Sequence, residues 1–191
     1  MPRNFHRAAL ITVTTALALL APAAGGAATT GFITVRPGDL IAVKGGALGC
    51  VVQLPGIVCY PSRAGKPRTG VFAVMLVAPG VASILRVGKD LSLTPVVTKV
   101  TPGTKLHRRG RTITLAVGQV ARLQPPAPAG PIDCAVVRSA GLPTLYCSQD
   151  DAVGPVVGSF AIVVNTTTAA IGRVGADRGT TIVSLRKQPK A

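Results

Sequence analysis

The four cysteines of this chain, Cys50, Cys59, Cys134 and Cys147, constrain its fold more than any other feature. An even number of cysteines in a chain that leaves the cytoplasm favours two disulfides over free thiols or a metal site. Four cysteines allow three pairings, and each pairing implies a different architecture. The choice between the pairings depends on whether the chain repeats itself.

An internal repeat selects one pairing. Residues 32–43 align with residues 112–123 at an offset of 80, and the two segments share an Ile-Thr pair and a turn glycine. The offset is 84 at the first cysteine of each pair and 88 at the second, and it stays at 88 for residues 70–74 against 158–162. An unchanged order with length changes at turns indicates a duplicated unit, the alternative being chance similarity between valine-rich strands. The repeat predicts disulfides between Cys50 and Cys59 and between Cys134 and Cys147.

Both predicted disulfides fit opposite positions of a β-hairpin. Pairing Cys50 with Cys59 leaves residues 53–56 as a four-residue loop, and pairing Cys134 with Cys147 leaves residues 139–142. Cβ atoms at opposite positions lie about 4.5–5.5 Å apart, so a small further approach allows the bond. Each bridge is expected to stabilise its unit by roughly 3 kcal/mol.

The composition favours strands over helices. The chain contains no Glu and is rich in valine, threonine, glycine and proline, which are depleted in helix interiors or enriched in strands and turns. We therefore predict an all-β fold of two tandem repeated units, each a small β-sandwich or barrel-like unit with one disulfide-closed hairpin. Arg86 and Arg173 interrupt apolar strands and are expected to point to solvent. The strands predicted for the first unit are 32–36, 39–44, 49–53, 57–60, 70–77, 81–87 and 95–100; those of the second repeat them and end on 180–185.

The N-terminal segment resembles a secretory signal. Arg3 and Arg7 precede an apolar run at residues 8–21, which is too short to span a bilayer as a helix and is followed by small residues. Cleavage after Ala23 or Ala27 would fit, and a retained anchor is the alternative. We predict a signal peptide at residues 1–27, a first β unit at 28–104, a basic linker at 105–111 and a second β unit at 112–191. The protein is then secreted, either extracellular or at the cell surface.

The chain lacks the residues of most catalytic sites. After removal of the signal the only histidine is His107, so a multi-histidine metal site is impossible. A carboxylate pair would have to come from six aspartates, of which only Asp150 and Asp151 are adjacent in sequence. We predict that the protein is not an enzyme and needs no cofactor or metal. A hydrolase that uses Asp150 and Asp151 is the enzymatic alternative.

The charge of the chain indicates an anionic partner. The formal net charge is +15, which attracts polyanions through a screened, salt-dependent interaction. Few aromatic residues are present, and this disfavours specific nucleic-acid binding. The predicted partner is an anionic cell-envelope polymer or another envelope protein. The candidate polyanion contacts are Arg63, Lys66, Arg68, Lys105, Arg108, Arg109 and Arg111.

These observations predict a secreted, non-enzymatic β-repeat protein that acts as a structural, adhesion or binding module at the cell envelope. The alternative is a secreted protease inhibitor that presents a disulfide-closed hairpin loop, with Leu54, Pro55 and Gly56 as the contact.

Overall fold

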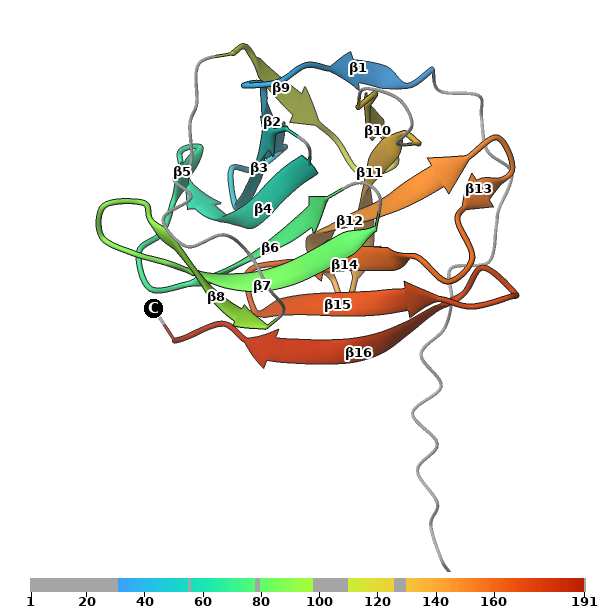
Figure 1. Ribbon diagram of the computed structural model, residues 1–191. Helices are drawn as coiled ribbons and strands as arrows, with labels where there is room; N and C mark the ends of the chain where they lie inside the picture. Colours follow the sequence, from blue (N-terminus) through green and yellow to red (C-terminus); the bar gives the residue numbers. More distant parts are fainter. Residues whose placement is uncertain (1–30, 55, 78–79, 98–109, 126–129, 191) are drawn as a thin grey trace, which may run out of the picture.

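The computed structural model is built from β-strands, with no helix among the residues that it describes, which are 31–190 without 55, 78–79, 98–109 and 126–129 (Figure 1). The strands form two sheets of eight strands each. The prediction of an all-β fold is therefore confirmed. Valine, isoleucine and threonine, whose branched side chains suit a pleated surface, supply much of the strand sequence.

Sheet one has the strand order β8-β7-β6-β4-β3-β2-β9, with the short β5 paired to β4. All neighbours are antiparallel except β2 and β9, which are parallel. Its strands are β2 (Leu40–Val43), β3 (Leu48–Gln53), β4 (Gly56–Arg63), β5 (Lys66–Pro67), β6 (Phe72–Val77), β7 (Val81–Val87), β8 (Leu93–Val97) and β9 (Thr112–Leu115).

Sheet two has the order β16-β15-β14-β12-β11-β10-β1, with β13 paired to β12. Here the parallel pair is β1 and β10. Its strands are β1 (Ile33–Val35), β10 (Val120–Leu123), β11 (Ile132–Ser139), β12 (Leu142–Asp151), β13 (Gly154–Pro155), β14 (Phe160–Val164), β15 (Thr168–Val174) and β16 (Thr180–Lys187).

The two sheets match in register as well as in order. Cys50 lies opposite Cys59 in sheet one as Cys134 lies opposite Cys147 in sheet two. Ile41 pairs with Cys50 in the same way as Ala121 pairs with Cys134. We call residues equivalent when they hold the same place in this common order and register. Two equivalent strands are exchanged between the sheets. β1, which precedes the strands of sheet one in the chain, joins sheet two, and its equivalent β9, which precedes the other strands of sheet two, joins sheet one.

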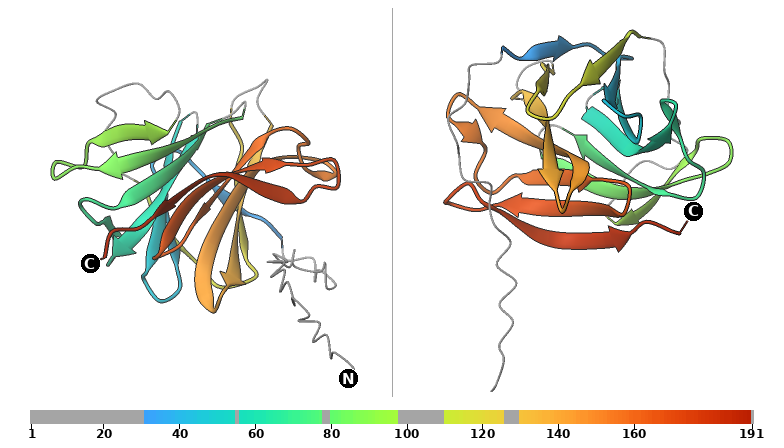
Figure 2. Two further views of the ribbon diagram at one scale, coloured as in Figure 1. Left: turned by 90° about the horizontal axis from the view of Figure 1, so that it is seen from below. Right: turned by 180° about the vertical axis from the view of Figure 1, so that it is seen from behind.

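One apolar core lies between the two sheets. It contains residues of both, among them Ile41 and Ile84 from sheet one and Ile162 and Ile171 from sheet two. Figure 2 shows the sheets as two facing layers, blue-green and orange-red. A second, smaller core that includes Tyr60 belongs to sheet one alone. Because the described strands of neither sheet close on themselves, the prediction of a separate sandwich or barrel for each unit is not confirmed.

Both predicted disulfides are confirmed. Cys50 is bonded to Cys59 and Cys134 to Cys147. The hairpins extend one pair further than expected, since Gln53 lies opposite Gly56 in one and Ser139 lies opposite Leu142 in the other. The loops therefore contain two residues rather than four.

Most predicted strands occur within a few residues of their expected bounds. Arg86 and Arg173 are exposed, as predicted, and each lies over the ring of a phenylalanine on the neighbouring strand, 5.6 Å from Phe72 and 5.4 Å from Phe160. The short strands β5 and β13 were not predicted, because two residues carry no periodicity. Three of the residues predicted to end the strand 95–100 lie outside the described part of the chain.

Candidate functional site

A cavity lies in each sheet, and these two cavities occupy equivalent places. Four pairs of equivalent residues line them: Leu40 and Val120, Ala42 and Arg122, Ala64 and Ala152, and Thr112 and Phe32. In sheet one, β9, β2 and the turn between β4 and β5 line the cavity. In sheet two, β1, β10 and the turn between β12 and β13 do so, β1 through Phe32 just before it (Figure 1). The two cavities differ in chemistry, and we call them the basic cavity and the polar cavity.

The basic cavity belongs to sheet one and has a volume of about 290 Å³. Lys44 and the hydroxyl-bearing Thr112 and Thr114 supply its polar side chains, and no acidic residue is among its described lining residues. Three glycines, Gly45, Gly46 and Gly65, also line it. Short side chains and hydroxyls around a lysine leave room for an anionic group to approach.

The turn between β4 and β5 carries two of the predicted polyanion contacts at the edge of the basic cavity. Arg63 and Lys66 are opposite residues on either side of the two-residue turn, and both are exposed. The turn residues Ala64 and Gly65 line the cavity and have φ values of 50° and 76°, the left-handed values that type I′ turns require. Arg63 and Lys66 therefore directly adjoin, along the chain, two residues that line the basic cavity.

The other predicted contacts have different places. Arg68 is half-buried just after β5. Arg111 donates from Nε to Oδ2 of Asp39 at 3.2 Å and from Nη2 to the Thr34 carbonyl at 2.7 Å. It thus links the strands exchanged between the sheets, which is a structural role. Lys105, Arg108 and Arg109 lie outside the described residues.

The polar cavity belongs to sheet two, has a volume of about 350 Å³ and contains an ion pair. Arg122 donates from Nε to Oδ1 of Asp133 at 2.7 Å and from Nη2 to Oδ2 at 2.5 Å. The guanidinium group also stacks 3.5 Å from the centre of the Phe32 ring. Asp133 is 7% exposed. A two-pronged bond and a stacked ring hold both charged groups in a fixed orientation.

Asp150 extends this network. Its Oδ1 accepts a hydrogen bond from the Ser148 hydroxyl at 2.6 Å, and its carboxyl group interacts electrostatically with the neighbouring Asp133 and Arg122. Burial, more than the neighbouring carboxylate, raises the pKa of Asp150 to about 6. The Asp150 carboxyl group therefore takes up a proton in mildly acidic solution.

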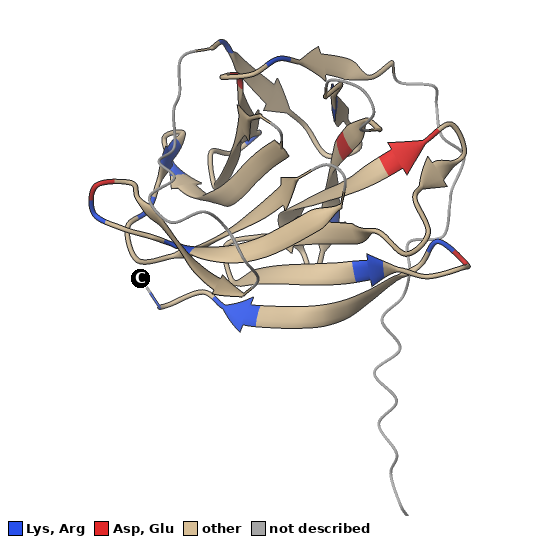
Figure 3. Cartoon of the chain, viewed as in Figure 1, with Lys and Arg blue, Asp and Glu red and all other residues tan. Residues whose placement is uncertain are grey.

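Tyr146 and Thr180 form a second hydrogen bond beside the network, with 2.5 Å between their hydroxyl oxygens. Burial raises the pKa of the Tyr146 hydroxyl, so the group stays protonated at neutral pH. Figure 3 shows acidic residues in red on β11 and at the end of β12, and basic residues in blue beside β5.

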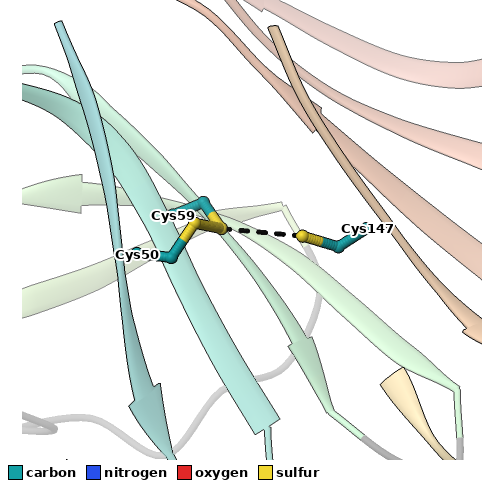
Figure 4. A group of neighbouring side chains, drawn as sticks. All are labelled: Cys50, Cys59 and Cys147. Atoms are coloured by element: carbon teal, nitrogen blue, oxygen red, sulfur yellow. Dashed lines mark hydrogen bonds between the residues drawn. A yellow bond between two sulfur atoms is a disulfide. The ribbon is translucent and has the colours of Figure 1, made fainter. Parts of the chain in front are cut away.

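The disulfides lie in the core, away from both cavities. The Sγ atoms of Cys59 and Cys147 are 3.8 Å apart across the interface between the sheets (Figure 4). Together with Cys50 they form a group of three sulfur atoms within 4.8 Å of one another. All three are disulfide-bonded and supply no thiolate, which a metal site would require.

The sequence analysis did not single out Asp133 or Arg122. The predicted hairpin register could have identified Asp133. Pairing Cys134 with Cys147 places Asp133 opposite Ser148, and Asp150 lies two residues further along the strand of Ser148. The sequence pairs Asp150 with the adjacent Asp151, whereas the structure places Asp150 beside Asp133 in the polar cavity. Asp151 accepts a hydrogen bond from the Val153 N–H in its own turn.

Comparisons with known proteins supply no relative for this chain. No family model, no curated protein and no solved structure matches it. A search of the described residues finds no helix of the length and apolar character that crossing a membrane requires.

Proposed function

We propose that this protein is a secreted, non-enzymatic β-repeat protein that acts as a structural or adhesion module at the cell envelope. In this proposal its basic cavity and the turn between β4 and β5 bind anionic groups of an envelope polymer. The predicted signal segment supports export, and two disulfides are compatible with an oxidising compartment.

The proposal includes a tandem duplication of the unit. Its support is the common strand order of the two sheets, the common hairpin register and the equivalent positions of the two cavities. Duplication accounts for these three agreements together. The proposed halves are residues 28–104 and 112–191, joined by a basic linker at 105–111.

The observation that carries the proposed function is the composition of the basic cavity. Lys44 lines it and the exposed Arg63 and Lys66 adjoin its lining residues Ala64 and Gly65, whereas the polar cavity is lined by Asp151 at the position of Arg63. An anionic group that enters meets positive charge without an adjacent carboxylate. Attraction of this kind is screened by salt, so binding should weaken as ionic strength rises.

Retention on envelope material tests this function. The protein is mixed with purified cell wall, with phosphatidylglycerol vesicles and with neutral phosphatidylcholine vesicles, and the bound fraction is measured after sedimentation at low and high salt. We expect retention on wall or on anionic vesicles that washes off with salt. Each cation near an anionic surface contributes about 1 kcal/mol, so Arg63→Ser with Lys66→Ser should weaken binding by roughly thirtyfold.

A matched control removes two exposed cations elsewhere. Arg138→Ser with Lys187→Ser changes the net charge equally, and both residues are exposed and belong to sheet two. This variant should lose far less affinity. Equal losses in the two variants would show that net charge alone decides binding, and retention that high salt does not reverse would contradict the proposal.

The protease-inhibitor alternative rests on the tip of the hairpin between β3 and β4. Leu54 at this tip is 46% exposed. Gln53 and Gly56 already pair with each other in the ladder, however, which disfavours their pairing with an enzyme edge strand, and Pro55 lies outside the described residues. A panel of secreted serine proteases that forms no stable complex with the protein would eliminate this alternative.

A further inference from the structure

The two equivalent cavities provide an internal comparison, because one fold carries two sets of side chains. At the places where the polar cavity has Arg122, Asp133 and Ser148, sheet one has Ala42, Gly49 and Tyr60. Tyr60 is 1% exposed and belongs to the smaller core of sheet one. A Cβ atom on Gly49 would lie 3.4 Å from its ring. Sheet one therefore has small residues and a buried aromatic ring at the positions where sheet two has the polar network.

The fold does not require these polar groups. Taking a charged pair out of water costs free energy that the attraction between the charges often fails to recover. Sheet one has the same strand order without an ion pair at the equivalent place, Ala42 opposite Gly49. A network that is costly, unnecessary for the architecture and open to a cavity is best explained by a ligand.

We propose that the polar cavity is a binding site for a neutral saccharide unit, held by hydrogen bonds to Asp133, Asp150 and Tyr146 and by packing against Phe32 and Pro155. This site is separate from the basic cavity and does not depend on the function proposed for that cavity.

The lining of the cavity accounts for the class of ligand. Carboxylates accept hydrogen bonds, whereas the hydroxyls of Ser148 and Tyr146 can donate or accept them. Sugar hydroxyls do both, and the C–H faces of a sugar ring can pack on Phe32, Ala135 and Pro155. The volume of about 350 Å³ falls within the usual range for small-molecule sites.

Charge argues against the ionic alternatives. Asp150 and Asp151 line the cavity and would repel an anion, while Arg122 already offsets the charge of Asp133. The formal net charge of +15 opposes the approach of a cation from a distance. A neutral ligand avoids both penalties.

Saturation-transfer NMR with defined sugars tests the proposal. The neutral probes are cellobiose, maltose and N,N′-diacetylchitobiose, each used up to about 10 mM, and glucosamine and glucuronate are the charged comparisons. We expect at least one neutral probe to bind with a Kd of about 1 mM or lower. Absence of binding by all three, or binding of the charged sugars only, would overturn the proposal.

Sheet one supplies the variant that should abolish binding. The triple change Arg122→Ala, Asp133→Gly and Ser148→Tyr transfers its residues to the equivalent positions, so the polar groups that would hold the sugar should be lost without loss of the fold. Circular dichroism and a disulfide map verify folding. Sugar binding that persists in the folded triple variant would overturn the proposal.

A milder pair of variants keeps the test independent of that repacking. Asp150→Asn preserves shape and removes a charged acceptor, and it should weaken binding by at least about tenfold. Asp177→Asn removes one acidic charge outside the cavity and retains an oxygen for the Gly179 N–H, so its affinity should be unchanged. Equal affinity in the two variants would place the sugar elsewhere and overturn the assignment.

Discussion

The Asp150 carboxyl group links the protonation of one residue to the stability of the protein. Burial raises its pKa from the ordinary value of 3.8 to about 6. Between these values the folded protein holds a proton that the unfolded chain has released. The stabilisation is complete below about pH 4 and is lost as the pH rises through about 6.

Replacing this carboxyl group should remove the pH dependence. The free energy of unfolding of the wild type should fall by about 1 kcal/mol between pH 4 and pH 7, a value that allows for solvent screening of a half-buried group. In Asp150→Asn it should change less over the same range. Urea unfolding followed by far-UV circular dichroism at several pH values measures this. Asp177→Asn is the charge-matched control. If the stability of the wild type instead rises from pH 4 to pH 7 in step with that of Asp150→Asn, the raised pKa of Asp150 is contradicted.

At the level of the element, the turn between β11 and β12 contains a residue in an unfavourable conformation. Ala140 has φ of 49° and is followed by Gly141 with φ of 78°. A left-handed conformation costs a residue with a Cβ atom about 1 kcal/mol, and Asn-Gly is the pair that such turns prefer. Alanine is therefore poorly matched to this position.

Ala140→Asn should raise the free energy of unfolding by about 0.5–1 kcal/mol. Thermal unfolding followed by circular dichroism detects such a gain. Ala152→Asn is the matched control, because Ala152 is exposed in the turn between β12 and β13 and is not among the residues with positive φ. A gain of equal size in both variants would indicate a general effect of asparagine rather than relief of this turn.

Local patterns predicted the elements better than their arrangement. The composition, the internal repeat and the cysteine spacing predicted the main strands and both disulfides. The exchange of β1 and β9 could not be predicted, because parallel pairing between distant strands leaves no mark in either strand. The polar cavity was missed for a related reason: Arg122, Asp133 and Asp150 come from three strands and meet only through the sheet register.

For the whole molecule, the contact between the two disulfides fixes how the sheets face each other. The Sγ atoms of Cys59 and Cys147 belong to different sheets, different disulfides and different halves of the chain, yet lie 3.8 Å apart. Both cysteines are fully buried. The contact can therefore report the packing of the sheets directly.

Removing the outer cysteine of each bridge should create a bond between the sheets. In Cys50→Ala with Cys134→Ala, Cys59 and Cys147 remain, and we expect them to form a disulfide under oxidising conditions because a modest approach brings them to bonding distance. A nonreducing peptide map identifies the new bond. The control variant, Cys50→Ala with Cys147→Ala, retains Cys59 and Cys134. Cys134 lies outside the close group of three sulfur atoms, so these two thiols should remain reduced. Two free thiols in the folded first variant would contradict this packing.

The exchange of β1 and β9 also governs the order of events during folding. Ile33 pairs with Ala121, so a strand at the start of the described chain waits for a partner that is synthesised much later. Sheet one likewise lacks its last strand until residues 112–115 are available. Long-range pairing of this kind slows folding. A chain that emerges N-terminus first therefore completes neither sheet until residues 112–123 have been synthesised, so the two sheets reach their final strand order together.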